Sequence, residues 1–319
     1  MPKIAVLTSG GDAPGMNAAI RAVVHQAAVH EARVVGIKHG FEGLLKREFV
    51  DMDLGSVDDI IQHGGTVLRS ARSDRFRTAV GQEEAAANLK EAGIDGVIVI
   101  GGEGSYRGGA ALTTKGIAVI GVPGTIDNDI PCTDYTIGFD TAVNTVVDAM
   151  NKIRDTATAH ERAFVVEVMG RASGHIALMA GLAGGAESIL IPEIPFDLDD
   201  VCRRLKWSAE RGKVHSIILV AEGVASAYAI GEEMKKRTGF DTRVSVLGHL
   251  QRGGAPTAFD RILASRLAAQ AVEVLLEGEN QAAMCYRAGQ VEAIPFSQVF
   301  ATTKDIDRSL YDLAAVLAM

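Results

Sequence analysis

The sequence has few cysteines and no long apolar segment, and each shortage argues against a class of protein. The three cysteines (Cys132, Cys202, Cys285) are widely spaced with no Cys-x-x-Cys pair. Neither a disulfide framework nor a zinc site is therefore expected, and a reducing compartment is favoured. The apolar stretch 177–182 is too short to span a bilayer, and residues 1–7 do not fit a signal peptide. We expect a cytoplasmic protein with no membrane partner.

Basic runs are also lacking, and the formal net charge is −8. The sequence therefore predicts no nucleic-acid partner. An acidic protein can still bind an anion when arginines are concentrated in a cleft. The length of 319 residues favours two domains, and a hydrophobic content of 47% is that of an ordinary globular protein with a buried core.

What the sequence does contain is a repeated succession of a short β-branched run, a glycine-rich break and a helical stretch. Continuous Val/Ile runs without alternation are typical of strands covered on both faces. The pattern predicts an α/β fold with mainly parallel, doubly wound sheets flanked by helices, and ligands bound beyond the carboxyl ends of the strands. Helices are expected over about 17–29, 107–113, 141–155, 173–182 and 257–276.

Two glycine-rich turns, at 10–11 and 101–105, follow strands and precede helices. Neither fits a Walker P-loop or the dinucleotide fingerprint. Backbone N–H groups free of side chains suit a polyphosphate, although each turn alone is equally consistent with a tight strand-to-helix connection. Glu103 within the second turn suggests a divalent cation such as Mg²⁺, because a bare carboxylate and a phosphate repel. A helix-N-terminal acid favoured by the dipole is the alternative.

The segment 125–129 (Thr-Ile-Asp-Asn-Asp) is the sharpest motif. In an extended turn Asp127 and Asp129 would lie on one side with Thr125, where one carboxylate accepts a proton from an attacking hydroxyl. A calcium loop is excluded, since its turn glycine and its terminal acid are missing. An Asx-rich turn without function stays open. Five arginines lie in or beside turns, and as a set they predict an anionic substrate. They are Arg72, Arg162, Arg171, Arg243 and Arg252.

Taken together, these turns resemble those of the bacterial 6-phosphofructokinases. The likeness is collinear from the first residues to about Gly278, and five segments carry it: 7–17, 100–105, 123–129, 168–171 and 247–254.

The resemblance implies a homotetramer of two-domain subunits with the active site in the cleft between the domains. The larger, ATP-binding domain is expected over 1–138 and about 252–304. The smaller, sugar-phosphate-binding domain is expected over about 139–251 and 305–319. The implied reaction, a step of glycolysis, converts fructose 6-phosphate and ATP into fructose 1,6-bisphosphate and ADP, with Mg²⁺.

Residue roles follow from the same resemblance. Asp127 is the expected base, and Thr125, Asp129, Arg171 and Arg72 are its expected catalytic partners. ATP is expected at Gly11, Arg72, Ser73, Phe76, Arg77, Gly102, Glu103, Gly104, Ser105 and Gly108, with Glu103 holding the metal. The sugar phosphate is expected at Thr125, Ile126, Asp127, Met169, Gly170, Arg171, Glu222, His249, Leu250, Gln251 and Arg252, with Arg162 and Arg243 reaching over from a neighbouring subunit. An ADP or phosphoenolpyruvate effector is expected at Arg21, His25, Arg154, Gly185, Glu187, Arg211, Lys213, Val214 and His215.

Some positions differ within the family. Pyrophosphate-dependent members typically carry Asp at Gly104 and Lys at Gly124, so both glycines favour ATP. The family has Asp where this chain has Glu103, and basic residues at His25 and Val214, which predicts a muted effector response. A pyrophosphate-dependent enzyme, and a nucleotide or sugar-phosphate sensor impaired at Glu103, are the alternatives.

Overall fold

The computed structural model describes residues 1–213 and 215–318. The chain forms two compact units, each with its own sheet. The first unit contains 1–126, 130–140 and 252–304, and the second contains 127–129, 141–251 and 305–319. The assignment of ATP to one unit and of a sugar phosphate to the other stays a prediction.

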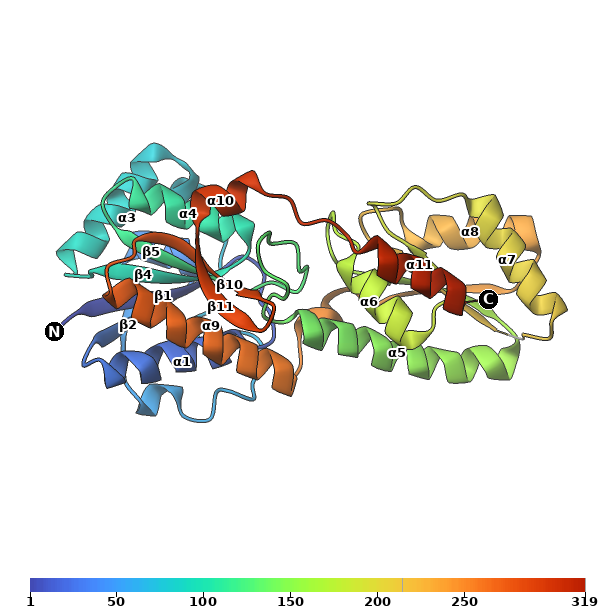
Figure 1. Ribbon diagram of the computed structural model, residues 1–319, viewed down its shortest axis with the longest axis horizontal. Helices are drawn as coiled ribbons and strands as arrows, with labels where there is room; N and C mark the ends of the chain where they lie inside the picture. The colour runs from blue at the N-terminus through green and yellow to red at the C-terminus, as the bar shows by residue number, and fades with distance from the viewer. Residues whose placement is uncertain (214, 319) are drawn as a thin grey trace. The chain divides into compact units, whose positions relative to one another are not determined.

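Within the described residues, the first unit has a seven-stranded sheet in the order β11-β10-β5-β4-β1-β2-β3. Its inner pairs are parallel, whereas β2–β3 and β10–β11 are antiparallel. The strands are β1 Lys3–Ser9, β2 Arg33–Ile37, β3 Phe49–Met52, β4 Gly96–Gly101, β5 Ala118–Pro123, β10 Gln281–Arg287 and β11 Gln290–Pro295. Helices cover both faces (Figure 1): α1 Met16–Val29, α2 Gly40–Lys46, α3 Ala79–Glu91, α4 Glu103–Thr113, α9 Ala258–Leu276 and α10 Phe296–Ala301.

The second unit has, in the described residues, a four-stranded parallel sheet in the order β7-β8-β6-β9. Its strands are β6 Ala163–Val168, β7 Ser188–Leu190, β8 Ser216–Ala221 and β9 Thr242–Val246. The helices are α5 Phe139–His160, α6 His175–Gly184, α7 Leu198–Glu210, α8 Ala227–Thr238 and α11 Arg308–Leu317. In Figure 1, α7 and α8 lie together on one side of this sheet, and α6 and α11 lie beside one another.

The predicted α/β class with mainly parallel sheets is confirmed. The continuous apolar run of β4 is buried at every position, as expected for a strand covered on both faces. One helix start was misplaced, because α4 begins at Glu103 rather than near Arg107. The glycines of 101–105 disfavour a helix in isolation, yet α4 packs against β4 and β5, and this packing stabilises the helix.

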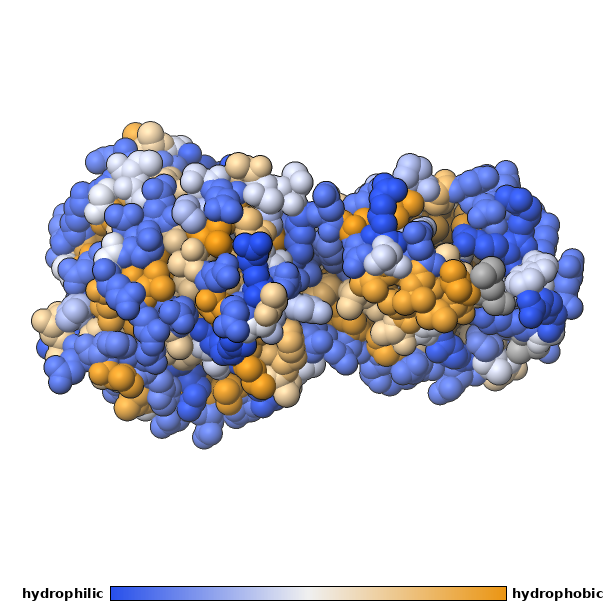
Figure 2. All heavy atoms as spheres, in the orientation of Figure 1, coloured by the Kyte–Doolittle hydropathy of each residue, from blue (hydrophilic) through white to orange (hydrophobic). Residues whose placement is uncertain are grey.

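Figure 2 shows hydrophilic residues over most of the visible face of each unit, and an apolar patch over α11. Leu313, Val316 and Leu317 are exposed there, at 44%, 56% and 68% of their surfaces. No helix in the described part of the chain is long and apolar enough to cross a membrane.

The cysteines give a first testable prediction. Cys285 is fully buried in the core of the first unit, and burial raises the pKa of its thiol to about 12. Burial also raises the pKa of Cys202. At pH 8 the thiolate fraction of Cys285 is about 10⁻⁴, so we expect neither thiol to react with a disulfide reagent until the chain unfolds. Thiol titration with and without denaturant checks this, and immediate reaction of all three cysteines in the native protein would contradict it.

Candidate functional site

In the first unit, the loops after β1, β4 and β5 touch one another. The Gly124 amide donates to the Gly101 carbonyl at 3.1 Å. A Cβ on Gly101 would lie 2.5 Å from both the Ser9 carbonyl oxygen and Ser105 Oγ, so only glycine fits there. The structure thus brings together three of the glycine-rich turns at the carboxyl ends of parallel strands, where ligands bind in such sheets.

The N-terminus of α4 is open. Gly102 caps the helix without a side-chain hydrogen bond. A Cβ on Gly104 would meet nothing within 4 Å. Unsatisfied N–H groups at a helix start, with no side chain over them, suit a phosphate group.

Gly124 differs from Gly104 in this respect. A Cβ on Gly124 would lie 2.9 Å from Ile100 Cγ2 and 3.1 Å from Met16 Cε. Packing alone therefore explains this glycine, and Gly104 carries more information about the phosphate donor.

Glu103, at the start of α4, is paired with Arg107. Its Oε1 accepts hydrogen bonds from Arg107 Nε at 2.9 Å and from Nη2 at 2.5 Å, and its side chain is 41% exposed. No group of three or more His, Cys, Asp or Glu residues suited to a metal occurs in the parts of the chain described. The residue fits Mg²⁺ as one protein ligand, since that ion takes one or two carboxylates and completes its shell with water and phosphate oxygens.

The loop that carries Arg72 lies against the β1 turn. Ser70 Oγ donates to the Gly10 carbonyl at 2.6 Å, and Arg72 is exposed. Ser73 Oγ donates to Glu42 Oε2 at 2.7 Å, and this bond lowers the pKa of the Glu42 carboxyl. The backbone two residues before Arg72 is thereby held at Gly10, while the Ser73 hydroxyl is already used within the fold.

Phe76 is buried rather than open to an adenine ring. Its side chain is 5% exposed and stacks on Phe41, with ring centroids 4.2 Å apart. A Cβ on Gly108 would lie 2.8 Å from the Phe41 ring, so Gly108 is required by this packing. Arg77 is exposed.

Gly11 and Arg252 lie together, although the sequence suggests them for different ligands. A Cβ on Gly11 would lie 2.4 Å from Arg252 Nη1. The buried Nε of Arg252 has no hydrogen-bond partner. This places a guanidinium at the β1 turn, where it can bind an anion.

The segment 125–129 is divided between the two units. Thr125, in the first, is partly buried and its carbonyl accepts a hydrogen bond from Thr136 Oγ1 at 2.6 Å; Ile126 is 2% exposed. Asn128 has a φ of 51°, so the backbone is not extended and the expected alternation of Asp127 and Asp129 does not apply.

Asp127 is a buried carboxylate of the second unit. It is 4% exposed, its Oδ2 lies 3.5 Å from Arg171 Nε, and its backbone carbonyl accepts from Ser173 Oγ at 3.1 Å. Asp129 is partly exposed. A buried carboxylate beside an exposed arginine suits proton abstraction from a hydroxyl next to a bound anion.

Glu222 holds the turn after β6. Its Oε1 accepts from the amides of Gly170 at 3.2 Å and Arg171 at 2.8 Å. Both residues have positive φ, 139° and 54°. A Cβ on Gly223 would lie 2.2 Å from the Arg171 carbonyl oxygen. The exposed Arg171 side chain is therefore presented by a turn that Glu222 and Gly223 fix.

Gln251 supports the same turn from another side. It is fully buried; its Oε1 accepts from the Met169 amide at 3.2 Å, and its Nε2 donates to the Gly248 carbonyl at 3.1 Å. Its neighbours His249 and Leu250 are exposed. Gln251 thus positions backbone, whereas His249 and Leu250 are open to a ligand.

Arg162 and Arg243 are brought together by Asp241. Asp241 Oδ2 accepts from Arg162 Nε at 2.6 Å and from Arg243 Nη2 at 3.1 Å. The hydrogen bond from Arg162 lowers the pKa of Asp241. The pair forms a cationic patch that one carboxylate partly neutralises.

Five expected effector residues form a contact chain in the second unit. Arg154 donates to the Gly184 and Gly185 carbonyls, Lys213 pairs with Glu187 at 2.6 Å, and His215 lies 3.1 Å from Thr158 Oγ1, one turn after Arg154. The other described residues of the expected effector set make no contact with these five that the structure records. Arg211 packs over the Trp207 ring at 4.4 Å, Arg21 and His25 are on α1 of the other unit, and Val214 lies outside the described residues.

Sequence reasoning missed four residues that shape these surfaces: Ser173, Glu193, Gly223 and Asp241. Glu193 Oε1 accepts from the Gly174 amide at 2.8 Å. Gly223 lies two residues after the end of β8, a position that the sequence could have indicated, whereas the other three act through contacts distant in sequence.

The fold and its strand-end loops define a doubly wound α/β protein with anion-binding features in both units. Comparison with known proteins narrows the class. The phosphofructokinase family profile matches residues 3–275. The ATP-dependent 6-phosphofructokinase of Brevibacillus brevis is 57% identical over 319 residues, covering all of both chains. The chain belongs to the phosphofructokinase family.

Solved structures agree with this assignment. The phosphofructokinase of Saccharomyces cerevisiae superposes with a TM-score of 0.88 at 35% identity; the match covers 100% of this chain and 48% of the yeast chain. A pyrophosphate-dependent phosphofructokinase from Marinobacter aquaeolei gives the same TM-score at 23% identity, covering 99% of this chain and 92% of that one. A pyrophosphate-dependent enzyme thus shares the fold of this chain, and the fold alone does not identify the phosphoryl donor.

Proposed function

We propose that this chain is an ATP-dependent 6-phosphofructokinase, which transfers the γ-phosphoryl group of ATP to the 1-hydroxyl of fructose 6-phosphate. The observation that carries the proposal is the 57% identity, over both full chains, to an enzyme of that name. The geometry supports it: an open helix N-terminus beside Gly104 in one unit, and a buried Asp127 beside Arg171 in the other.

In the proposed reaction Asp127 accepts the proton of the 1-hydroxyl of the sugar, while the oxygen of that hydroxyl forms a bond to the γ-phosphorus of ATP. The bond between that phosphorus and the β-phosphate oxygen breaks, and ADP leaves. Arg171 and Thr125 stabilise charge on the transferring group, and Asp129 supports them. Glu103 would hold Mg²⁺, which neutralises phosphate charge.

The two ligands are proposed to bind through separate sets of residues. ATP is held by the β1 and β4 turns with Arg72. The sugar phosphate is held by the turn at Met169–Arg171, by Glu222, by the exposed His249, and by Arg252. We also propose a cytoplasmic homotetramer in which Arg162 and Arg243 serve a neighbouring subunit.

The product tests the proposal. Incubation with fructose 6-phosphate and MgATP should give fructose 1,6-bisphosphate and ADP in equal amounts by ³¹P NMR. Release of inorganic phosphate without the bisphosphate would show a nucleotide hydrolase and contradict it. Binding of both ligands without turnover would identify a sensor.

Glu103 gives a prediction that separates a metal ligand from a helix pair. E103Q should lower kcat and raise the Mg²⁺ concentration for half-maximal activity by about 10- to 100-fold, because a metal-binding carboxylate is lost. R107Q breaks the same ion pair but keeps the carboxylate, and should leave the Mg²⁺ dependence unchanged. Equal Mg²⁺ curves for E103Q and the parent would mean that Glu103 serves only its pair with Arg107.

The expected effector residues give another testable prediction. Because His25 and Val214 stand where the family places basic residues, we expect phosphoenolpyruvate to inhibit weakly and without strong sigmoidicity. Initial velocities across a phosphoenolpyruvate titration measure this. Strong sigmoidal inhibition at low effector concentration would overturn the expectation, and the variant V214K should move the response in that direction.

A further inference from the structure

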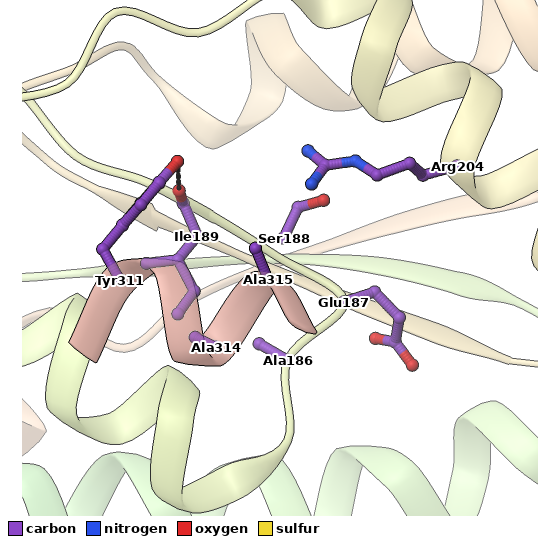
Figure 3. Close-up of a pocket in the computed structure, with 8 residues that line it drawn as sticks. All are labelled: Ala186, Glu187, Ser188, Ile189, Arg204, Tyr311, Ala314 and Ala315. Carbon is purple, nitrogen blue, oxygen red and sulfur yellow. Dashed lines mark hydrogen bonds between the residues drawn. The ribbon is translucent and has the colours of Figure 1, made fainter. Parts of the chain in front are cut away.

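Figure 3 shows a small pocket of the second unit, between β7, α7 and α11. Ser188 and Arg204 face one another across it, and Tyr311 donates a hydrogen bond to the Ile189 carbonyl at 3.2 Å. Its cavity volume is about 10 Å³, which is room for about one water molecule. The pocket is therefore too small to bind an organic ligand.

In the first unit, the loop that carries Arg72 has no secondary structure of its own. Between the 3₁₀ helices Gly55–Val57 and Arg75–Arg77, the described backbone forms neither an α-helix nor a strand. The position of such a loop depends on the partners that its N–H and C=O groups find elsewhere in the fold. The Arg72 side chain is exposed, so its placement follows from the backbone that carries it.

Asn17 is a buried asparagine of α1 that binds this loop at three points. It is 2% exposed; its Oδ1 accepts from the Val67 amide at 2.8 Å, and its Nδ2 donates to the carbonyls of His63 at 3.1 Å and Gly64 at 3.3 Å. One acceptor faces an N–H and one donor faces two carbonyls, so both ends of the side-chain amide are used. An ionised aspartate would lack the donor that the two carbonyls need.

Two hydroxyls continue the anchoring of the loop toward Arg72. Thr8 Oγ1, fully buried near the end of β1, donates to the Arg69 carbonyl at 2.8 Å, and Ser70 Oγ donates to the Gly10 carbonyl at 2.6 Å. Arg69 has a φ of 61°, a conformation that costs free energy and persists only where contacts hold it. The loop is therefore bound to α1 and β1 from residue 63 to residue 70, just before Arg72.

We infer that Asn17 is a positioning residue for Arg72, because it holds on α1 the loop from which that side chain extends. The inference rests on the proposed function, in which Arg72 helps to hold ATP. The hydrogen bonds recorded for the Asn17 side chain are with protein backbone, so it acts on the reaction only through the loop.

Asn88 provides a matched control in the same unit. It is 4% exposed; its Nδ2 donates to the carbonyls of Leu44 at 3.1 Å and Leu45 at 3.2 Å, and its Oδ1 accepts from Arg47 Nε at 2.7 Å. N17D and N88D therefore each remove a donor from two buried carbonyls. A loss that both variants share reflects the fold, whereas a loss confined to N17D reflects the loop.

Steady-state kinetics with varied ATP test the inference, at a temperature where circular dichroism shows every variant folded. N17D should lower kcat/KM for ATP by about 10- to 100-fold, because a small displacement of a phosphate-binding group has effects of this size. Its KM for fructose 6-phosphate should change little, and N88D should keep the parental kcat/KM for ATP. In an R72Q background N17D should cost less than about twofold, since no guanidinium is left to position.

The same factor for N17D in the parent and in R72Q would overturn the inference, as would parental kinetics of N17D or an equal loss in N88D. Hydrogen exchange of residues 63–72 gives a readout that does not depend on turnover. N17D should speed exchange there, and exchange like that of the parent would overturn the inference even in an inactive protein. Faster exchange in N17D, with no ATP turnover by the parent, would support the anchoring by Asn17 and contradict the proposed function.

Discussion

Replacement of Asp127 by asparagine is expected to lower kcat by about 10²- to 10⁴-fold, the contribution of a positioned general base. The substitution keeps the size of a side chain that is 4% exposed, so the fold and the KM for fructose 6-phosphate should change little. The loss should appear in initial velocities at saturating MgATP.

Asp148 provides the control. It is an exposed aspartate of α5 that pairs with Lys152 at 2.5 Å, and D148N makes the same chemical change away from the proposed site. D148N should retain full activity. If D127N retained activity within a few-fold of the parent while D148N did the same, the assignment of Asp127 as base would be wrong.

A carboxylate at position 104 is expected to have the second large effect. G104D places a negative charge at the open start of α4, where we propose the ATP phosphates lie. Two unit charges 4 Å apart at an effective dielectric of 20 repel by about 4 kcal/mol, which corresponds to about 10³-fold in kcat/KM for ATP. Steady-state kinetics with varied ATP measure the change.

The matched variant is G104A. A Cβ at this position meets nothing within 4 Å, so it adds a methyl group without charge or clash. We expect nearly unchanged kinetics and a stability gain of up to about 1 kcal/mol from the better helix former. Equal losses in G104A and G104D would show that space, and not charge, governs donor binding here.

The fold class could be predicted from the sequence because the apolar runs that indicate strands and the glycine-rich segments that indicate turns alternate regularly. The unbroken apolar run of β4 is buried throughout, and its glycine-rich end faces the ends of β1 and β5. Local propensity failed at α4: Gly108 disfavours a helix, but its contact with the Phe41 ring, which is remote in sequence, leaves no room for a side chain.

The sequence indicates which residues could carry chemistry, but it does not indicate which residues they contact. A motif shows Asp127 and Arg171, but not that they lie 3.5 Å apart. It also misleads about alternation, because Asn128 adopts a positive φ that interrupts the extended backbone. Gln251 looks like a ligand residue in sequence, yet its amide is used to hold backbone. Asp241, which joins Arg162 to Arg243, has no sequence signature at all.

The central claim is that this family member uses ATP to phosphorylate fructose 6-phosphate, and donor preference tests it most directly. Initial velocities should be compared with ATP and with pyrophosphate at equal, saturating Mg²⁺ and fructose 6-phosphate. We predict turnover with ATP and no detectable turnover with pyrophosphate. Turnover with pyrophosphate alone would contradict the account, and would show that an open Gly104 does not select the nucleotide.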